Sequence, residues 1–264
     1  MHDLRNDLSA DVSVYPVRAF QDNYIWTLQK GSNAAVVDPG EAGPVLAYLR
    51  AHKLNLTAIL NTHHHADHVG GNAELLEHYP VPVYGPYDER ITTVSERVRE
   101  GDRFTLPGFD IGFEVFEIPA HTRTHIAFYG DGMLYCGDTL FACGCGRLFE
   151  GTPAQMHASL TKLARLPGAT RVYCGHEYTE SNIKFARVVD AANTALVEWE
   201  KTAAAARAKD EPTLPSTLAQ ELTANPFMRC DQPAIAAAAS QHAGRPLHDP
   251  VSVLGALREW KNNF

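Results

Sequence analysis

The sequence predicts an α+β protein with two domains, a strand-rich one over residues 1–177 and a helical one over residues 178–264. Short apolar runs of strand length dominate the first two thirds of the 264 residues. Helical patterns separate only some of these runs, which favours helices on the outer faces of a strand-dominated domain. After Tyr178 the composition changes abruptly to alanine-rich helical segments, which places the domain boundary there.

The strand-rich region contains apolar runs with many β-branched and aromatic residues, a composition typical of strands. Other segments between them repeat apolar residues at helical spacing. In chain order we expect strands at 13–18, 23–29, 34–40, 56–62, 82–85, 111–120, 125–131, 133–138 and 171–176, and helices at 41–53, 70–79 and 152–166.

The helical region is punctuated by Pro212, Pro215 and Pro226, because proline cannot continue a helix. The last helix has a clear start signal, since Asp249 suits the N-cap and Pro250 suits the first helical position. We expect helices at 182–210, 216–224, 232–240 and 249–264.

Charge and composition argue against several classes of partner. The net charge is −8, and the basic residues do not form the stripe that nucleic acid binding requires. No apolar run has the length of a membrane span, and residues 1–14 lack the apolar core of a secretory signal. We expect a cytoplasmic protein that binds neither nucleic acid nor membrane, and we expect it to be a monomer.

The five cysteines are an odd number without regular spacing, which predicts reduced thiols and no disulfide framework. Cys143 and Cys145 lack the two-residue spacer of a zinc knuckle, and no second pair follows them. We expect both to be small, packed loop residues.

Four histidines and an aspartate gather in "HHHADH", residues 63–68, directly after an apolar strand. Protonated imidazoles repel one another, so this clustering indicates a bound positive ion. A strand end followed by a turn can direct His63 and His65 into one cavity, whereas a helix would send them to different faces. Asp67 and His68 follow at the start of the next helical pattern, and the stretch predicts a metal site.

The stretch "THHHADHVGG" resembles the signature of the metallo-β-lactamase-fold hydrolases. The resemblance implies a four-layer αββα sandwich, in which two sheets pack face to face and the metals lie at one edge. It also implies later ligands in "PAHT", "CGDTLF" and "CGHEYT". The implied ligands are His63, His65 and His121 for one divalent ion, Asp67, His68 and His176 for a second, and Asp138 as the bridge between the two ions.

A mixture of imidazole and carboxylate suits zinc, iron or manganese, and zinc is the metal that we expect. His64 and His125 are expected to pack beside the ligands without binding metal. Thr124 stands where relatives usually carry glycine, a departure that concerns the local loop and not His121.

Hydrolysis is the chemistry expected of two adjacent divalent ions, because they provide hydroxide at neutral pH and polarise a carbonyl oxygen. Asp67 and Asp138 are the expected catalytic ligands. The chain has no "GxSxG" motif, so a covalent acyl-enzyme is not indicated.

Five further stretches resemble glyoxalase II, the hydroxyacylglutathione hydrolases, over nearly the whole chain. They are "FQDNYIW" (20–26), "GCGRLFEGT" (144–152), "GHEYTESNIKFA" (175–186), "ANPFMR" (224–229) and "LREWKNNF" (257–264). The resemblance implies hydrolysis of S-D-lactoylglutathione to glutathione and D-lactate, the second step of methylglyoxal detoxification. It implies that a helical, substrate-binding domain and the loop after Asp138 hold the glutathione part through Arg147, Phe149, Tyr178, Arg258 and Lys261.

Arg147 and Phe149 depart from the family pattern, in which lysine and tyrosine are frequent. Arg258 and Lys261 lie three residues apart and share a helix face, which suits the carboxylates of glutathione. Without the resemblance, these basic residues would be attributed to the helix macrodipole.

The residues leave three other functions open. A persulfide dioxygenase of the same fold needs one iron and fewer ligands, and a nuclease is disfavoured by the acidic balance. A non-catalytic redox or metal-storage protein could use the same ligands as a closed site. Oxygen consumption would identify the dioxygenase, and absence of thioesterase turnover would identify the storage protein.

Overall fold

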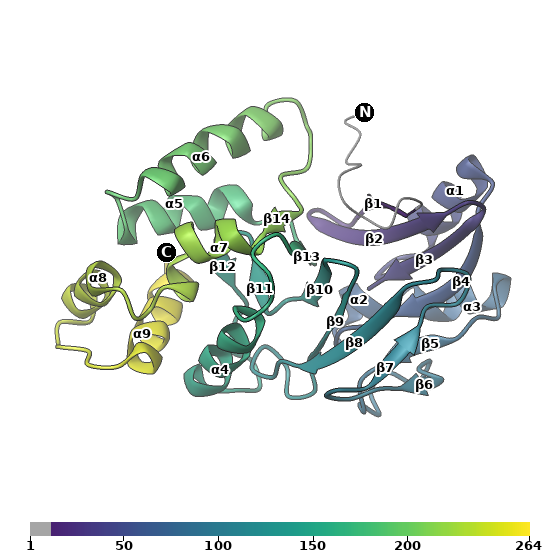
Figure 1. Cartoon of the computed structure of the whole chain (residues 1–264), viewed down its shortest axis with the longest axis horizontal. Coiled ribbons are helices and arrows are strands. Elements are labelled where there is room, and N and C mark those ends of the chain that lie inside the picture. The colour runs from purple at the N-terminus through teal and green to yellow at the C-terminus, as the bar shows by residue number, and fades with distance from the viewer. Residues whose placement is uncertain (1–11) are drawn as a thin grey trace. The chain divides into compact units, whose positions relative to one another are not determined.

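The computed structural model describes residues 12–264, which form two compact units (Figure 1). Unit 1 contains the chain up to Glu117 together with Thr124–Gly137, and unit 2 contains Ile118–Arg123 and Asp138–Phe264. The domain boundary expected at residue 178 stays a prediction. The expectation of a missing secretory signal falls largely on residues 1–11, which lie outside the described residues.

A six-stranded sheet forms the first layer of strands in unit 1, in the order β1-β2-β3-β4-β5-β6 (Figure 1). The first three strands form an antiparallel meander, and the following ones run parallel to β3. The strands are β1 (Ser13–Ala19), β2 (Asn23–Lys30), β3 (Asn33–Val37), β4 (Asn55–Leu60), β5 (Val83–Gly85) and β6 (Glu96–Arg97).

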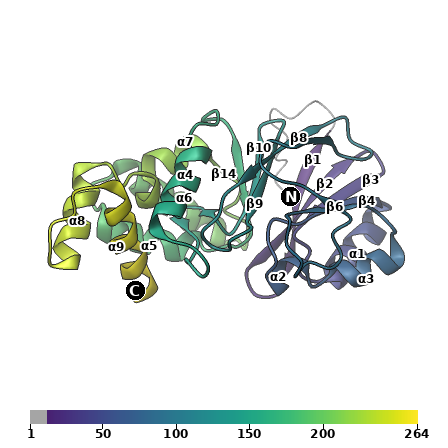
Figure 2. The same ribbon diagram turned by 90° about the horizontal axis from the view of Figure 1, so that it is seen from below.

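Helices supply the crossovers that neighbouring parallel strands require. Helix α1 (Ala42–His52) connects β3 to β4, and α2 (Ala66–Val69) and α3 (Asn72–His78) lie between β4 and β5. Helices α1 and α3 lie on the same side of the sheet (Figure 2). Their apolar side chains pack against it. The core between them includes Val17, Ile25, Val36, Val45, Leu49, Ile59, Leu75 and Val83.

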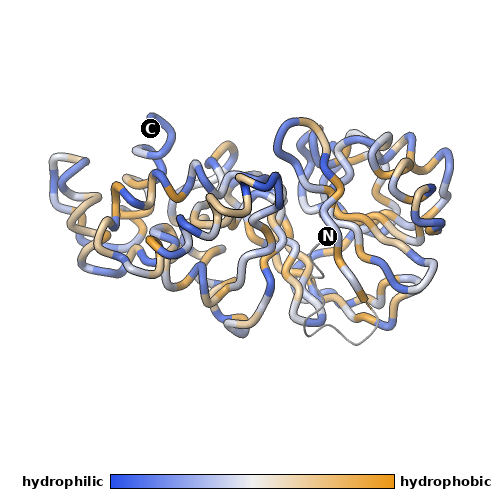
Figure 3. The backbone as a smooth tube through the Cα atoms, turned by 90° about the horizontal axis from the view of Figure 1, so that it is seen from above, coloured by the Kyte–Doolittle hydropathy of each residue, from blue (hydrophilic) through white to orange (hydrophobic). Residues whose placement is uncertain are grey.

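A second, antiparallel set of strands in unit 1 has the order β10-β9-β8-β7. These strands are β7 (Arg103–Thr105), β8 (Gly112–Glu117), β9 (Ile126–Gly130) and β10 (Met133–Gly137). Phe104 of β7 stacks on Tyr84 of β5 with a centroid separation of 4.2 Å, so the two sets of strands face each other. Along the backbone, hydrophobic and hydrophilic segments alternate (Figure 3).

Unit 2 contains most of the helices. They are α4 (Pro153–Leu163), α5 (Thr179–Val189), α6 (Thr194–Arg207), α7 (Leu218–Ala224), the 3-10 turn η1 (Pro226–Met228), α8 (Pro233–Ala243) and α9 (Pro250–Asn262). Short strands join them: β11 (Leu140–Phe141) pairs with β12 (Gly144–Cys145), and β13 (Arg171–Cys174) pairs with β14 (Ser216–Thr217).

The strands and helices expected in the first two thirds are confirmed, with bounds that differ by a few residues. The start of the last helix is also confirmed, because the Asp249 side chain accepts the Ser252 backbone N–H at 2.9 Å. The two-residue strands β6, β11 and β12 were not predicted, since they are too short to show a period.

The single helix expected over 182–210 is wrong. The chain forms two helices there, because Asn193 acts as an N-cap and its side chain accepts the N–H groups of Ala195 and Leu196. Asparagine competes with the helical backbone for hydrogen bonds, an effect that periodicity alone does not reveal. Over residues 12–264, the helices lack the length and apolar character that a membrane crossing demands.

Candidate metal centre

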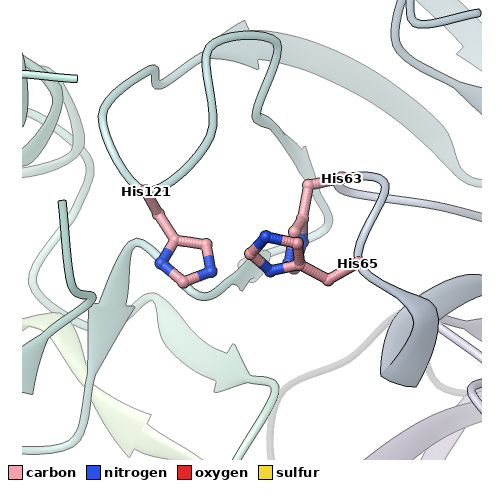
Figure 4. Close-up of side chains that lie close together, drawn as sticks. All are labelled: His63, His65 and His121. Carbon is pink, nitrogen blue, oxygen red and sulfur yellow. The ribbon is translucent and has the colours of Figure 1, made fainter. Parts of the chain in front are cut away.

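The first group of predicted ligands lies in unit 1, at the end of β4. His63 and His65 leave the loop that follows this strand (Figure 4), and His63 Nε2 lies 3.1 Å from His65 Nδ1. His68 follows on α2, and its ring centroid lies 4.1 Å from that of His63. His63 and His68 are buried. The strand end and the short helix together concentrate imidazoles in one place, as the sequence pattern predicted.

A buried carboxylate on the neighbouring strand orients two of these imidazoles. Asp38 follows β3, and its Oδ2 accepts the Thr62 hydroxyl at 2.6 Å and lies 3.1 Å from His68 Nδ1. A carboxylate only accepts, so the His68 proton lies on Nδ1 and Nε2 keeps its lone pair. Thr62 Oγ1, its proton directed to Asp38, lies 3.0 Å from His63 Nδ1 and can accept from it.

Asp67 is held close to this group through its own backbone and side chain. Asn23 Nδ2 donates to Asp67 Oδ2 at 3.1 Å and to the Asp67 carbonyl at 3.3 Å. Asp67 Oδ2 lies 3.4 Å from His68 Nε2. The carbonyl side also needs glycine at position 40, since a Cβ on Gly40 would lie 2.0 Å from the Asp67 oxygen.

The second group of predicted ligands lies in unit 2 and comes from three separate segments. His121 is on the loop after β8 (Figure 4), Asp138 follows β10, and His176 follows β13. The Nε2 atoms of His121 and His176 lie 3.4 Å and 3.3 Å from Asp138 Oδ2. All three side chains are buried. One carboxylate oxygen therefore faces two imidazole nitrogens.

The orientation of His121 follows from its hydrogen bond to the backbone. His121 Nδ1 lies 2.9 Å from the Arg147 carbonyl oxygen, which can only accept. The proton therefore lies on Nδ1, and the lone pair of Nε2 is directed toward Asp138. Two acceptors that face each other across 3.4 Å are compatible with a cation between them, so the donor set fits a metal ion.

The other histidines near the ligands pack beside them. His125 is buried, its ring stacks on His63 at 4.5 Å, and its Nδ1 lies 3.1 Å from the Ile126 carbonyl oxygen. His64 Nδ1 lies 3.5 Å from Asp88 Oδ2. Burial raises the pKa of Asp88, but hydrogen bonds from Arg90 and Thr124 outweigh it and hold this pKa below its usual value.

Three of the residues expected to bind substrate lie near the second group, in unit 2. Phe149 is exposed, and its ring lies 5.2 Å from that of His121 in an edge contact. Tyr178 stacks on His176 with a centroid separation of 4.8 Å and an interplanar angle of 5°. Arg147 is exposed and supplies the carbonyl that His121 contacts.

The two basic residues of α9 have different surroundings. Arg258 is buried, its Nη1 donates to the Cys145 carbonyl at 2.5 Å, and its guanidinium lies over the Phe227 ring. Lys261 is half-buried and donates to the carbonyl and hydroxyl oxygens of Ser181, both at 3.1 Å. Burial, and then the charges of Arg258 and Arg147, lower the pKa of Lys261 to about 8.

Sequence reasoning missed the residues that orient the histidines, above all Asp38. A signal was present, because "AVVDPG" ends an apolar strand in a carboxylate next to the strand that precedes His63. The pairing of Val37 with Leu60 in parallel strands brings the ends of β3 and β4 together. This pairing forms only in the folded sheet, so the sequence did not show that Asp38 lies near the histidines.

Comparison with known proteins gives matches over nearly the whole chain. The model of the metallo-β-lactamase superfamily matches residues 20–176, and the model of the hydroxyacylglutathione hydrolase C-terminus matches residues 177–264. The hydroxyacylglutathione hydrolase of Nitrosomonas eutropha is 53% identical over 253 residues, which cover 96% of this chain and 99% of the relative. The chain belongs to the hydroxyacylglutathione hydrolase family. The member from Nitrosomonas europaea is 52% identical and covers 96% of this chain and 97% of its own length.

Solved structures place this family member in the metallo-β-lactamase fold, as the sequence predicted. The B3 metallo-β-lactamase BLEG-1 has a TM-score of 0.61 and 23% identity, and the match covers 82% of this chain and 99% of that one. A protein solved in a di-iron-bound form has a TM-score of 0.53 and 32% identity, over 62% of this chain and 92% of that one. The α+β class is confirmed, and the fold implies binding of divalent metal.

Proposed function

We propose that this chain hydrolyses the thioester of an S-(2-hydroxyacyl)glutathione to glutathione and a 2-hydroxy acid. The observation that carries this proposal is the 53% identity, over 96% of the chain, to a relative named hydroxyacylglutathione hydrolase. The match of residues 177–264 to the C-terminal model of the same family supports it independently of the metal ligands. S-D-lactoylglutathione is the proposed substrate and D-lactate the proposed acid.

We further propose that two divalent ions act in the reaction, with zinc as the expected metal. His63, His65 and His121 would hold one ion, and Asp67, His68 and His176 would hold the other, with Asp138 between them. When bound, such a pair lowers the pKa of a water molecule and polarises the thioester carbonyl. Support comes from the direction of the His68 and His121 Nε2 lone pairs and from the carboxylate oxygens beside them.

The chain's own groups keep these ligands in the correct tautomer. Asp38 accepts from Thr62 and from His68, and the Arg147 carbonyl accepts from His121, so the Nδ1 protons stay on the side away from the reacting atoms. Asn23 restrains the Asp67 carboxylate with one hydrogen bond. These contacts reduce the reorganisation that the site needs before reaction.

Residues of unit 2 are proposed to bind the glutathione part. Phe149 and Tyr178 offer exposed aromatic faces next to His121 and His176, and Arg147 and Lys261 offer cations for the carboxylates. Arg258 completes the proposed set. On this view residues 178–264 are the substrate-binding domain and residues 1–177 the catalytic one. A glutathione thiol leaves readily as thiolate, so the chain needs no dedicated general acid.

The decisive experiment combines turnover with metal counting on the same preparation. We expect hydrolysis of S-D-lactoylglutathione, two divalent ions per chain at full activity, and no oxygen consumption with glutathione persulfide. Full activity with one ion would contradict the binuclear mechanism. Oxygen consumption without thioester hydrolysis would favour a dioxygenase, and neither activity would favour metal storage.

The cytoplasmic location and the monomeric state stay predictions. Cell fractionation tests the first, and light scattering of the purified protein tests the second.

A further inference from the structure

The β11–β12 hairpin, residues 140–145, lies in the chain between the proposed ligand Asp138 and the exposed Arg147. Its backbone is bound by side chains that come from three helical regions of unit 2. Asn182 of α5 donates to the Ala142 carbonyl at 3.0 Å, and Arg258 of α9 donates to the Cys145 carbonyl at 2.5 Å. The backbone of this hairpin is thus positioned by residues distant in sequence.

Glu221 in the middle of α7 and Asn225 directly after this helix make the central contacts. The Cys143 N–H donates to Glu221 Oε2 at 3.0 Å, and Asn225 Nδ2 donates to the Gly144 carbonyl at 2.9 Å and to the Phe141 carbonyl at 3.3 Å. Asn225 Nδ2 also lies 2.9 Å from Glu221 Oε2, so the two side chains act as one group. Cys143 has a φ of 57°, an unfavourable backbone conformation that this group holds in place.

Glu221 is a carboxylic acid in a position where an apolar side chain would be expected. It is fully buried, and burial raises its pKa to about 7 against the opposing hydrogen bonds from Ser216, Asn225 and Cys143. A buried carboxyl group costs stability, and an apolar side chain would fill the same volume without that cost. The burial of Glu221 is explained if the backbone N–H of Cys143 needs a hydrogen-bond acceptor that is held in one place.

The residues that flank the hairpin on both sides lie next to the proposed ligands. The Gly146 N–H donates to the Thr139 carbonyl at 3.1 Å, next to Asp138. A Cβ on Gly146 would lie 1.9 Å from the Asp138 carbonyl oxygen and 3.1 Å from His121 Nδ1, so the backbone passes directly beside both residues. The following carbonyl, that of Arg147, accepts from His121.

We propose that Glu221 and Asn225 are positioning residues for His121 and Asp138, and that they act through the β11–β12 hairpin. A shift of this hairpin would move the carbonyl that orients His121 and the backbone that carries Asp138. The α7 region then serves metal binding as well as folding. The effect on turnover rests on the proposed hydrolase function, whereas the effect on metal affinity does not.

The test is Glu221→Leu, which keeps a side chain of similar size but removes the oxygen that accepts from Cys143 and Asn225. We expect zinc affinity, measured by competition with a chelator, to fall roughly 10-fold. Turnover of S-D-lactoylglutathione should show a similar fall in kcat and little change in KM. The matched control is Leu218→Ala on the same helix, because Leu218 is buried and its apolar side chain holds no hairpin backbone group. Leu218→Ala should lower the melting temperature and leave zinc affinity within twofold of wild type.

Equal zinc affinity in Glu221→Leu and in wild type would overturn the proposal, as would equal losses in Glu221→Leu and Leu218→Ala. If Glu221→Leu does not fold, Asn182→Ala decides, since it releases only the Ala142 carbonyl and should weaken zinc binding several-fold. Unchanged zinc affinity in Asn182→Ala would then overturn the proposal. A wild-type protein without thioesterase activity would contradict the hydrolase function and leave the zinc comparison intact.

Discussion

The two groups of proposed metal ligands are built in different ways. In unit 1 the ligands lie within residues 63–68, and a carboxylate on the adjacent strand, Asp38, orients two of them. In unit 2 the ligands His121, Asp138 and His176 come from three loops, and the Arg147 carbonyl, which follows a hairpin held by helices, orients His121. The first group depends on neighbouring strands, and the second on contacts between distant parts of the chain.

The two ligand groups should therefore differ in their sensitivity to substitutions elsewhere in the chain. A compact motif tolerates changes elsewhere, because the strand pairing between β3 and β4 already brings Asp38 to His68. A group assembled from separate loops inherits every displacement of the elements that hold those loops. Substitutions remote in sequence should therefore affect the ligands of unit 2 more than those of unit 1.

The largest effect is expected from Asp138→Ala, which removes the carboxylate shared by His121 and His176. Loss of the bridge should lower kcat on the order of 10³-fold, since about 4 kcal/mol of transition-state stabilisation is at stake. KM should change little, and metal analysis should give fewer than two ions per chain. An intact kcat with a raised KM would assign Asp138 to substrate binding.

Asp38→Ala tests the dependence of unit 1 on a single orienting group. Without this acceptor the His68 ring can adopt the wrong tautomer, and metal affinity should fall roughly 10- to 100-fold. Titration of the metal-free protein with zinc measures this. The control is Asp110→Ala, which removes an exposed carboxylate of the same unit, bound to Lys30 at 2.7 Å. Similar zinc affinities in the two variants would remove Asp38 from the site.

Lys261→Ala separates substrate binding from metal binding in unit 2. A half-exposed charged hydrogen-bond partner is worth about 1–2 kcal/mol, so KM for the glutathione thioester should rise roughly 10-fold. The kcat value, and turnover of a small thioester without the tripeptide, should stay near wild type. A higher salt concentration should also raise the KM of the wild-type protein for the glutathione thioester, because salt screens the attraction between charges.

Arg258→Ala should differ from Lys261→Ala, because Arg258 also holds the Cys145 carbonyl. We expect both a raised KM and a lowered kcat. If both variants bind the thioester like wild type, the helix macrodipole is the better account of these two residues.

The smallest expected effect is a change of KM with pH. The pKa of Lys261 is lowered from its usual 10.5 to about 8, so its ammonium loses the proton as the pH rises through 8. The attraction for a substrate carboxylate is thus present below pH 8 and lost above it, and KM should rise several-fold between pH 7 and pH 9. Lys261→Gln should abolish this dependence; a wild-type profile that persists in the variant would assign the titration elsewhere.

Local patterns carried most of the fold prediction, and their failures share one cause. The expected helix over 182–210 was wrong because Asn193 makes capping hydrogen bonds within a region of strong helix formers. The surroundings of Arg258 were also not predicted: its side chain is buried over Phe227 and bonded to Cys145, more than a hundred residues away, while its role in substrate binding stays a prediction. Helical spacing places a residue on a face but does not say what that face covers.

The strand-rich and helical regions, the imidazole cluster at residues 63–68 and the family follow from the amino-acid sequence alone. Each depends on residues that are close together or on stretches that can be compared directly. The groups that orient the ligands are brought to them only by folding, because they lie far away in the sequence. Asp38 meets His68 across 30 positions, His121 meets the Arg147 carbonyl across 26, and Glu221 meets Cys143 across 78. The last two contacts use a backbone group that residues of any type offer, and the first joins side chains that come together only when the strands pair, so sequence spacing does not mark these partners.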